Sequence, residues 1–219
     1  LAAQQMPNNR RAKGLIRQYG FSAFSVADAY SDSIRVLSYL SVPNHVLQFI
    51  KGDNGFEAKY EATLSIKEKK GSQFGRKNWS NTLQTNDYIE STSRKIFTIH
   101  FAEFKVPPGN YIISAELLDR DSNDSGVRNK ELKFSKHEDN VSLYTPFFLD
   151  YLYGRWGLED NEIPLFQSFS GEKLTRTSVF ISGKVQKGPY NLEVTVLNAK
   201  KKELWKKSFQ AKASEKYFH

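Results

Sequence analysis

The chain has 219 residues, of which 39% are hydrophobic and 26% are charged, and its formal net charge is +8. This is enough apolar material to bury a core, which excludes an intrinsically disordered chain. The sequence contains no cysteine, which excludes disulfides, thiolate metal sites and thiol nucleophiles. No apolar run reaches the roughly 18 residues that a membrane-spanning helix needs.

The positive charge is concentrated at the two ends of the chain. Residues 1–20 carry four basic and no acidic side chains, and residues 200–219 carry seven basic and two acidic ones. The segment between them, residues 21–199, is close to neutral. This distribution predicts no specific binding of nucleic acid. Two interpretations stay open. Either the basic residues are solvated or protect edge strands, or the basic termini dock locally to an acidic partner.

The first 20 residues are interpreted as a basic lead, partly helical or disordered. The chain begins Leu1-Ala2-Ala3-Gln4-Gln5, which resembles the region around a signal-peptidase cleavage site. We therefore expect an extracytoplasmic location, periplasmic or secreted, after removal of a signal peptide.

From residue 21 the apolar positions alternate with period two. The alternation is clearest over Phe56–Ile66, where the even positions are apolar and the odd ones polar, as in an antiparallel sheet with one solvated face. Ser33–Leu40 is also expected to be half-buried. Seven strands in about 115 residues predict an immunoglobulin-like sandwich over residues 21–138; they are expected at 33–40, 46–51, 56–66, 74–83, 95–101, 112–118 and 127–134.

A second, smaller sandwich is expected over residues 139–219. Its strands are predicted at 141–148, 166–169, 178–185, 190–197 and 202–210. The predicted fold class is therefore all-β, with two tandem immunoglobulin-like antiparallel β-sandwiches.

A family resemblance rests on four stretches of the sequence. They are Ser33–Ile66 with its Gly52-Asp53-Asn54-Gly55 turn, the tryptophan segment Asn78-Trp79-Ser80, the run Phe104–Tyr111 with Pro107-Pro108-Gly109, and the later Ile163-Pro164 with the hairpin Ser178–Trp205. Together they resemble the N-terminal β-sandwich region of bacterial GWxTD-domain proteins. The resemblance implies an exported protein built from β-sandwiches. The Gly-Trp-x-Thr-Asp motif that names the family does not occur in this chain, and no functional residue is carried over.

One loop carries oxygen ligands at alternate positions, as calcium loops do. The candidate ligands are Asp119, Asp121, Asn123 and Asp124. An EF-hand would need glycine in place of Asp124 and glutamate in place of Lys130. The alternatives are a calcium site of another kind and an ordinary Asp/Asn/Ser/Gly hairpin loop.

Two further segments are candidates for binding a partner. An aromatic stretch over residues 144–156 is either a core between the two sandwiches or a partner surface; its candidate contact residues are Tyr151, Tyr153 and Trp156. The run Lys200–Lys207 is predicted to be a basic hairpin whose lysines point to both faces, with candidates Lys201, Lys202, Lys206 and Lys207.

No catalytic motif, cofactor fingerprint or metal-ligand spacing was found, and His100 is interpreted as a satisfied histidine on a strand. We therefore expect no enzyme and no cofactor. The favoured hypothesis is an exported structural protein that contacts other proteins of a bacterial envelope-associated assembly. The alternatives are a carbohydrate-binding module that uses Trp156 and a hydrolase whose carboxylates meet only in the fold.

Overall fold

The computed structural model describes residues 15–28, 31–134, 141–151, 162–164, 177–185, 189–211 and 217–218. Within these residues the ordered elements are almost all strands, and every strand pairing is antiparallel. The predicted all-β class is therefore confirmed. The three short helical elements are η1 (Leu15–Gln18), η2 (Asn44–Val46) and α1 (Tyr88–Ser91).

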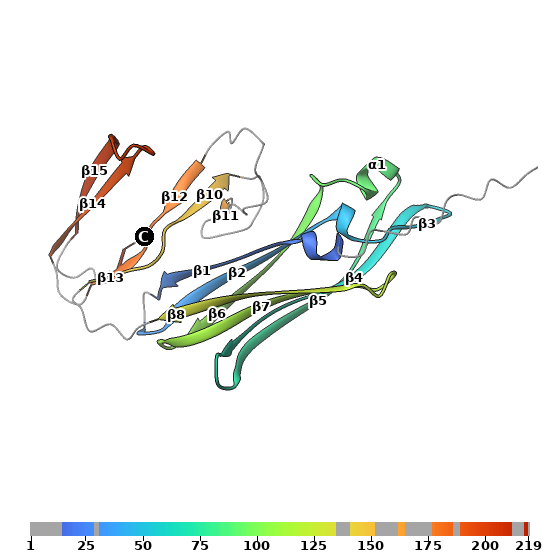
Figure 1. Ribbon diagram of the computed structural model, residues 1–219, viewed down its shortest axis with the longest axis horizontal. Helices are drawn as coiled ribbons and strands as arrows, with labels where there is room; N and C mark the ends of the chain where they lie inside the picture. Colours follow the sequence, from blue (N-terminus) through green and yellow to red (C-terminus); the bar gives the residue numbers. More distant parts are fainter. Residues whose placement is uncertain are drawn as a thin grey trace, which may run out of the picture.

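The first eight strands form two sheets. Sheet A has the order β1-β2-β6 and consists of β1 (Gly20–Ala27), β2 (Ile34–Pro43) and β6 (Phe97–Val106). In sheet B, β4 pairs with β5 along one edge and with β3 and β7 along the other, while β8 pairs with β7. Sheet B consists of β3 (Ile50–Gly52), β4 (Gly55–Glu68), β5 (Gln73–Thr85), β7 (Gly109–Asp119) and β8 (Ser125–Phe134). Figure 1 shows the two sheets stacked on each other.

The chain passes between the sheets in the manner of an immunoglobulin-like sandwich. Two strands of sheet A are followed by the β4–β5 hairpin of sheet B, and β6 then returns to sheet A before β7 and β8 complete sheet B. A second hallmark supports this assignment. Tyr111, at the start of β7, donates its hydroxyl hydrogen bond to the carbonyl of Pro107, four residues earlier, at 2.8 Å, which is the geometry of a tyrosine corner.

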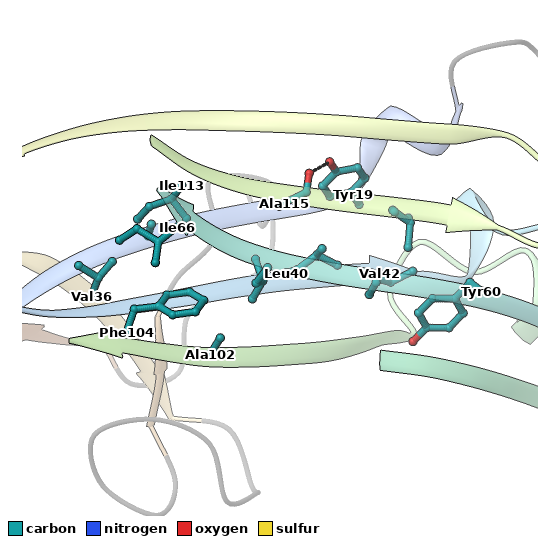
Figure 2. Close-up of a cluster of buried hydrophobic side chains, with 14 of the residues drawn as sticks. Tyr19, Val36, Leu40, Val42, Tyr60, Ile66, Ala102, Phe104, Ile113 and Ala115 are labelled. Carbon is teal, nitrogen blue, oxygen red and sulfur yellow. Dashed lines mark hydrogen bonds between the residues drawn. The ribbon is translucent and has the colours of Figure 1, made fainter. Parts of the chain in front are cut away.

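The main core lies between sheets A and B (Figure 2). The even positions of β4, from Ala58 to Ile66, are buried, which confirms the alternation predicted for this strand. The core also holds Tyr19, whose hydroxyl donates to the carbonyl of Ala115 at 2.6 Å. Because burial disfavours the phenolate, it raises the pKa of Tyr19 far above its ordinary value, so Tyr19 acts as a neutral hydrogen-bond donor.

Strand β2 is buried on both faces, so the prediction of a half-buried strand is wrong. Its even positions face sheet B, and its odd positions Leu37 and Tyr39 face a second apolar cluster. That cluster contains Phe147, whose ring lies 4.3 Å from the ring of Phe24, measured between centroids. The ring of Phe180 lies 5.1 Å from Phe147. The outer face of sheet A is therefore covered by residues from the C-terminal part of the chain.

The described C-terminal strands form three small antiparallel sheets. One has the order β11-β10-β12, another β16-β13-β9, and the last is the hairpin β14–β15. Their bounds are β9 (Val141–Leu143), β10 (Phe147–Tyr151), β11 (Glu162–Pro164), β12 (Thr177–Phe180), β13 (Gly183–Val185), β14 (Tyr190–Leu197), β15 (Glu203–Ala211) and β16 (Tyr217–Phe218). The boundary at residue 138 and the strand expected at 166–169 lie outside the described residues and stay predictions.

Local differences from the expected elements occur where short turns interrupt the alternation. The strand expected at 46–51 is replaced by η2 and the short β3, because Leu47 turns back to donate its backbone N–H to the carbonyl of Asn44 at 3.0 Å. The segments 141–148 and 178–185 are each divided into two strands. Helix α1 was not predicted; its N-cap is Asp87, whose side chain accepts the N–H of Ile89 at 2.7 Å.

Candidate functional site

The loop after β7 uses its carboxylates to bind the backbone. Asp119 is fully buried, and its side chain accepts the backbone N–H of Gln48 at 2.6 Å and that of Asp121 at 3.0 Å. Asp121 in turn accepts the N–H of Lys59 at 2.7 Å, and Asn123 has a φ of 57°, a conformation that asparagine tolerates in turns. The geometry therefore favours the ordinary hairpin loop over the calcium site.

We expect the variant Asp119→Ala to be destabilised by about 2–3 kcal/mol, because it leaves the half-buried backbone N–H groups of Gln48 and Asp121 without their acceptor. The loss should be the same in calcium and in EDTA, as measured by urea unfolding. A stability of the unaltered protein that rises with calcium, and an Asp119→Ala variant that no longer responds, would show that this loop is a calcium site after all.

The aromatic stretch 144–156 is divided between described and undescribed residues. Tyr144 and Phe147 are buried and belong to the two apolar clusters that involve the first sandwich. For these two residues the interpretation as a core between the two parts of the chain is supported. Tyr151 ends β10, but its side chain, together with Tyr153 and Trp156, lies outside the described residues, so their proposed role in binding stays a prediction.

The basic run 200–207 forms the turn and the start of the second strand of hairpin β14–β15, as predicted. Asn198 organises the turn, because its side chain accepts the backbone N–H groups of Lys200 at 2.9 Å and Lys202 at 3.0 Å. Lys201 lies at the tip with a φ of 61°. The three consecutive lysines are exposed, so they place three positive charges at the end of the hairpin.

The pairing register gives the hairpin one apolar face. Val196 lies opposite Trp205, and Leu192 lies opposite Phe209. Because directly opposed residues of an antiparallel pair share a face, these side chains and Val194 lie on the same side, which we call the apolar face. Trp205 is 47% exposed and Phe209 is 42% exposed. This face is therefore accessible to solvent over much of its area.

The two lysines on β15 point to opposite faces, as the alternation predicted. Lys206 lies on the other face, where its ammonium group is 2.9 Å from the carboxylate of Glu193; this neighbour raises the pKa of Lys206. Lys207 lies on the apolar face, with its ammonium nitrogen 4.9 Å from the centroid of the Phe209 ring. The apolar face thus combines exposed aromatic rings with a cation.

His100 occupies a buried polar cluster between the sheets, as the interpretation of a satisfied histidine predicted. Its Nε2 lies 3.0 Å from the hydroxyl of Tyr60, which also accepts the side-chain amide of Asn81 at 2.9 Å. The ring of Trp79 lies 4.8 Å from the imidazole ring, measured between centroids. Burial lowers the pKa of His100 to about 4, so the imidazole is neutral at pH 7.

A hollow of about 340 Å³ is lined by residues of the β3–β4 turn. Figure 1 shows strand β3 at the end of the first sandwich that is far from the hairpin. The carboxylates that line the hollow are those of Asp53 and Glu57. Glu57 accepts a hydrogen bond from Gln84 at 2.8 Å and pairs with Lys59 at 2.8 Å. These contacts lower the pKa of Glu57, which is the opposite of what a general acid requires.

No family model matches the sequence, and no curated protein matches it significantly. A crystal structure of Bacteroides uniformis beta-glucuronidase is similar with a TM-score of 0.34 and 14% identity, over 62% of this chain and 14% of that chain. A similarity this weak carries no argument about fold or function. The relationship to GWxTD-domain proteins therefore stays a prediction.

In the part of the chain that the structure describes, no three His, Asp or Glu side chains are grouped so that they could hold a metal ion. Among the same residues, no helix is long and apolar enough to span a membrane.

Sequence reasoning singled out the lysines of the hairpin but missed its apolar residues. The signal was present in the alternation of Tyr190–Leu197, where every second residue is apolar. Pairing this strand with the one that carries Trp205 and Phe209 would have revealed the apolar face. Leu197 and Leu204, which are 51% and 65% exposed, flank the lysine turn and were missed as well.

Proposed function

We propose that this protein is a non-enzymatic, exported structural protein that contacts other proteins of a bacterial envelope-associated assembly, and that hairpin β14–β15 is its docking surface. The observation that carries the proposal is the exposed apolar face of this hairpin, bordered by lysines. Exposed aromatic side chains of this kind supply much of the binding energy at protein interfaces.

The architecture of the hairpin supports this role. Among the described residues, β14 and β15 pair with each other and with no third strand. A two-stranded hairpin by itself is only marginally stable in water, so a partner that covers the apolar face stabilises it. Figure 1 shows the hairpin at the end of the molecule opposite to α1 and β3, where a second protein can approach it.

The charges indicate what kind of partner fits. Five lysines lie between residues 200 and 207, and the acidic residues of the hairpin are Glu193 and Glu203. Glu193 is already paired with Lys206. The partner surface is therefore expected to be an apolar patch with acidic residues around it, which attracts the lysine turn and buries Trp205.

The test is photo-crosslinking in the bacterium that makes the protein. A photoreactive phenylalanine at Leu204, which is 65% exposed next to Trp205 at the start of β15, should give a discrete crosslinked protein. The matched control is the same group at Val127, which is 57% exposed on β8 of the first sandwich. No crosslink from position 204, or the same products from both positions, would contradict the proposal.

The carbohydrate-binding alternative depends on Trp156, which lies outside the described residues, and no described feature favours it.

A further inference from the structure

The first sandwich has two sides on which the edges of sheets A and B meet, and they are built differently. On one side the edge strand β8 is tied to the N-terminal segment. Arg128 donates to the carbonyl of Tyr19 at 2.7 Å, and Lys130 donates to the carbonyl of Ala23 at 2.7 Å. Charged side chains of this kind are the usual protection of an edge strand against pairing with another chain. The β8 edge is therefore protected.

On the opposite side, strand β5 has a long edge without such protection. It spans 13 residues, and among the described residues it pairs with β4 alone. From Asn78 to Thr85 it contains eight consecutive residues with neither a charge nor a proline. Its side chains alternate between exposed and half-buried along this stretch. The backbone edge of this segment is thus available for strand addition.

The charges that flank this neutral segment are complementary to each other. Arg76 and Lys77 precede it, and Asp87 and Glu90 follow it. When two copies of the strand pair antiparallel about a two-fold axis, the basic end of each lies toward the acidic end of the other. Parallel pairing would instead bring like charges together. The arrangement is therefore self-complementary, as an interface between identical chains must be.

The faces of the strand also match in such a pair. Ser80 and Thr82 are exposed on the polar outer face of sheet B, opposite Glu61 and Lys59 of β4. Trp79 and Leu83 are half-buried on the inner face and pack against the core. Antiparallel pairing in register would continue the polar face across the joint and bring the half-buried apolar residues of two copies together.

We propose that two copies of this chain associate through their β5 strands, antiparallel about a two-fold axis centred within residues 78–85, and join their B sheets into one continuous sheet. The contact is a single strand edge, so its area is at the low end for specific interfaces. The dimer is accordingly weak, with dissociation in the micromolar range, and it weakens with salt because charges at the strand ends contribute.

The test is sedimentation equilibrium of the full chain, with the double variant Ser80→Lys and Thr82→Lys. In the dimer these four lysines lie close together across the axis, so the dissociation constant should rise at least tenfold. The matched control is Val127→Lys with Asn129→Lys, two exposed outer-face positions on the protected strand β8, which should leave the dimer unchanged. Far-ultraviolet circular dichroism and melting curves establish that both variants are folded.

A unique cysteine gives an independent readout, because the natural chain has none. Thr82→Cys should form a disulfide-linked dimer under oxidising conditions, whereas Asn129→Cys should not. A chain that stays monomeric at 500 μM, or lysine variants on β5 and β8 that dissociate equally, would overturn the proposal. Substitutions on hairpin β14–β15 should leave this dimer intact, so the outcome is separate from that of the proposed docking function.

Discussion

Replacing Phe147 with alanine is expected to lower the free energy of unfolding by about 3–5 kcal/mol, the usual range for a buried phenylalanine. Phe147 is only 4% exposed and packs between Phe24 of sheet A and Phe180 of β12. Its removal takes away the centre of the cluster that joins the C-terminal strands to the first sandwich. Urea unfolding followed by fluorescence measures the loss.

The matched control for this variant is Phe209→Ala, the same truncation at a position that is 42% exposed. Because a large part of its area stays in contact with solvent, its cost should be well below that of Phe147→Ala. Equal losses from the two variants would mean that the cluster around Phe147 does not hold the two parts together. The ion pair between Lys184 and Asp32 also joins these parts, but it is exposed on one side and should contribute little.

The stability of the protein is expected to fall by about 3 kcal/mol between pH 7 and pH 4 through His100 alone. The ordinary pKa of histidine is 6.5, and burial lowers it to about 4 in the folded protein. In the unfolded chain the imidazole is therefore protonated below about pH 6.5, whereas in the folded chain it becomes protonated only near pH 4. The contribution of the neutral His100 ring to the free energy of unfolding is complete above pH 6.5 and is lost as the pH falls toward 4.

Unfolding free energies measured from pH 7 to pH 4 test this expectation with His100→Gln, which cannot titrate in this range. The variant should lose about 3 kcal/mol less than the unaltered protein over the interval. His45→Gln, at the other histidine of the described residues, is the control and should keep most of the pH dependence. Identical pH profiles for the unaltered protein and His100→Gln would show that the imidazole is not held neutral by burial.

The sequence predicted those parts of the fold that depend on local alternation. The faces of Phe56–Ile66 and of residues 205–209 were assigned correctly. The assignment was wrong for Glu203, because the register shift between Val196 and Leu197 places Glu203 opposite Leu197, on the face away from Trp205. The same logic failed for β2, because the side chains that cover its outer face come from Phe147 and Phe180, more than a hundred residues away. The sequence of a short apolar strand does not indicate that residues from a distant, C-terminal part of the chain cover its second face.

The candidate site was predicted only in part for a related reason. The lysines were visible as a run of one residue type, whereas the apolar face appears only when the register pairs Val196 with Trp205. The acidic loop was read as a possible calcium site because spacing cannot show what a carboxylate binds. In the fold, Asp119 is committed to the backbone of Gln48, 71 residues earlier.

If the apolar face of hairpin β14–β15 binds a partner protein, that contact should depend on Trp205 and Phe209. The most direct test compares the crosslinking yield from Leu204 in the unaltered chain with that in a chain carrying Trp205→Ser and Phe209→Ser. Both residues are substantially exposed, so the variant should stay folded. We predict that the yield of the crosslinked partner falls at least tenfold in the folded variant. An undiminished yield, or a large loss of stability showing that the fold itself needs this face, would contradict the account.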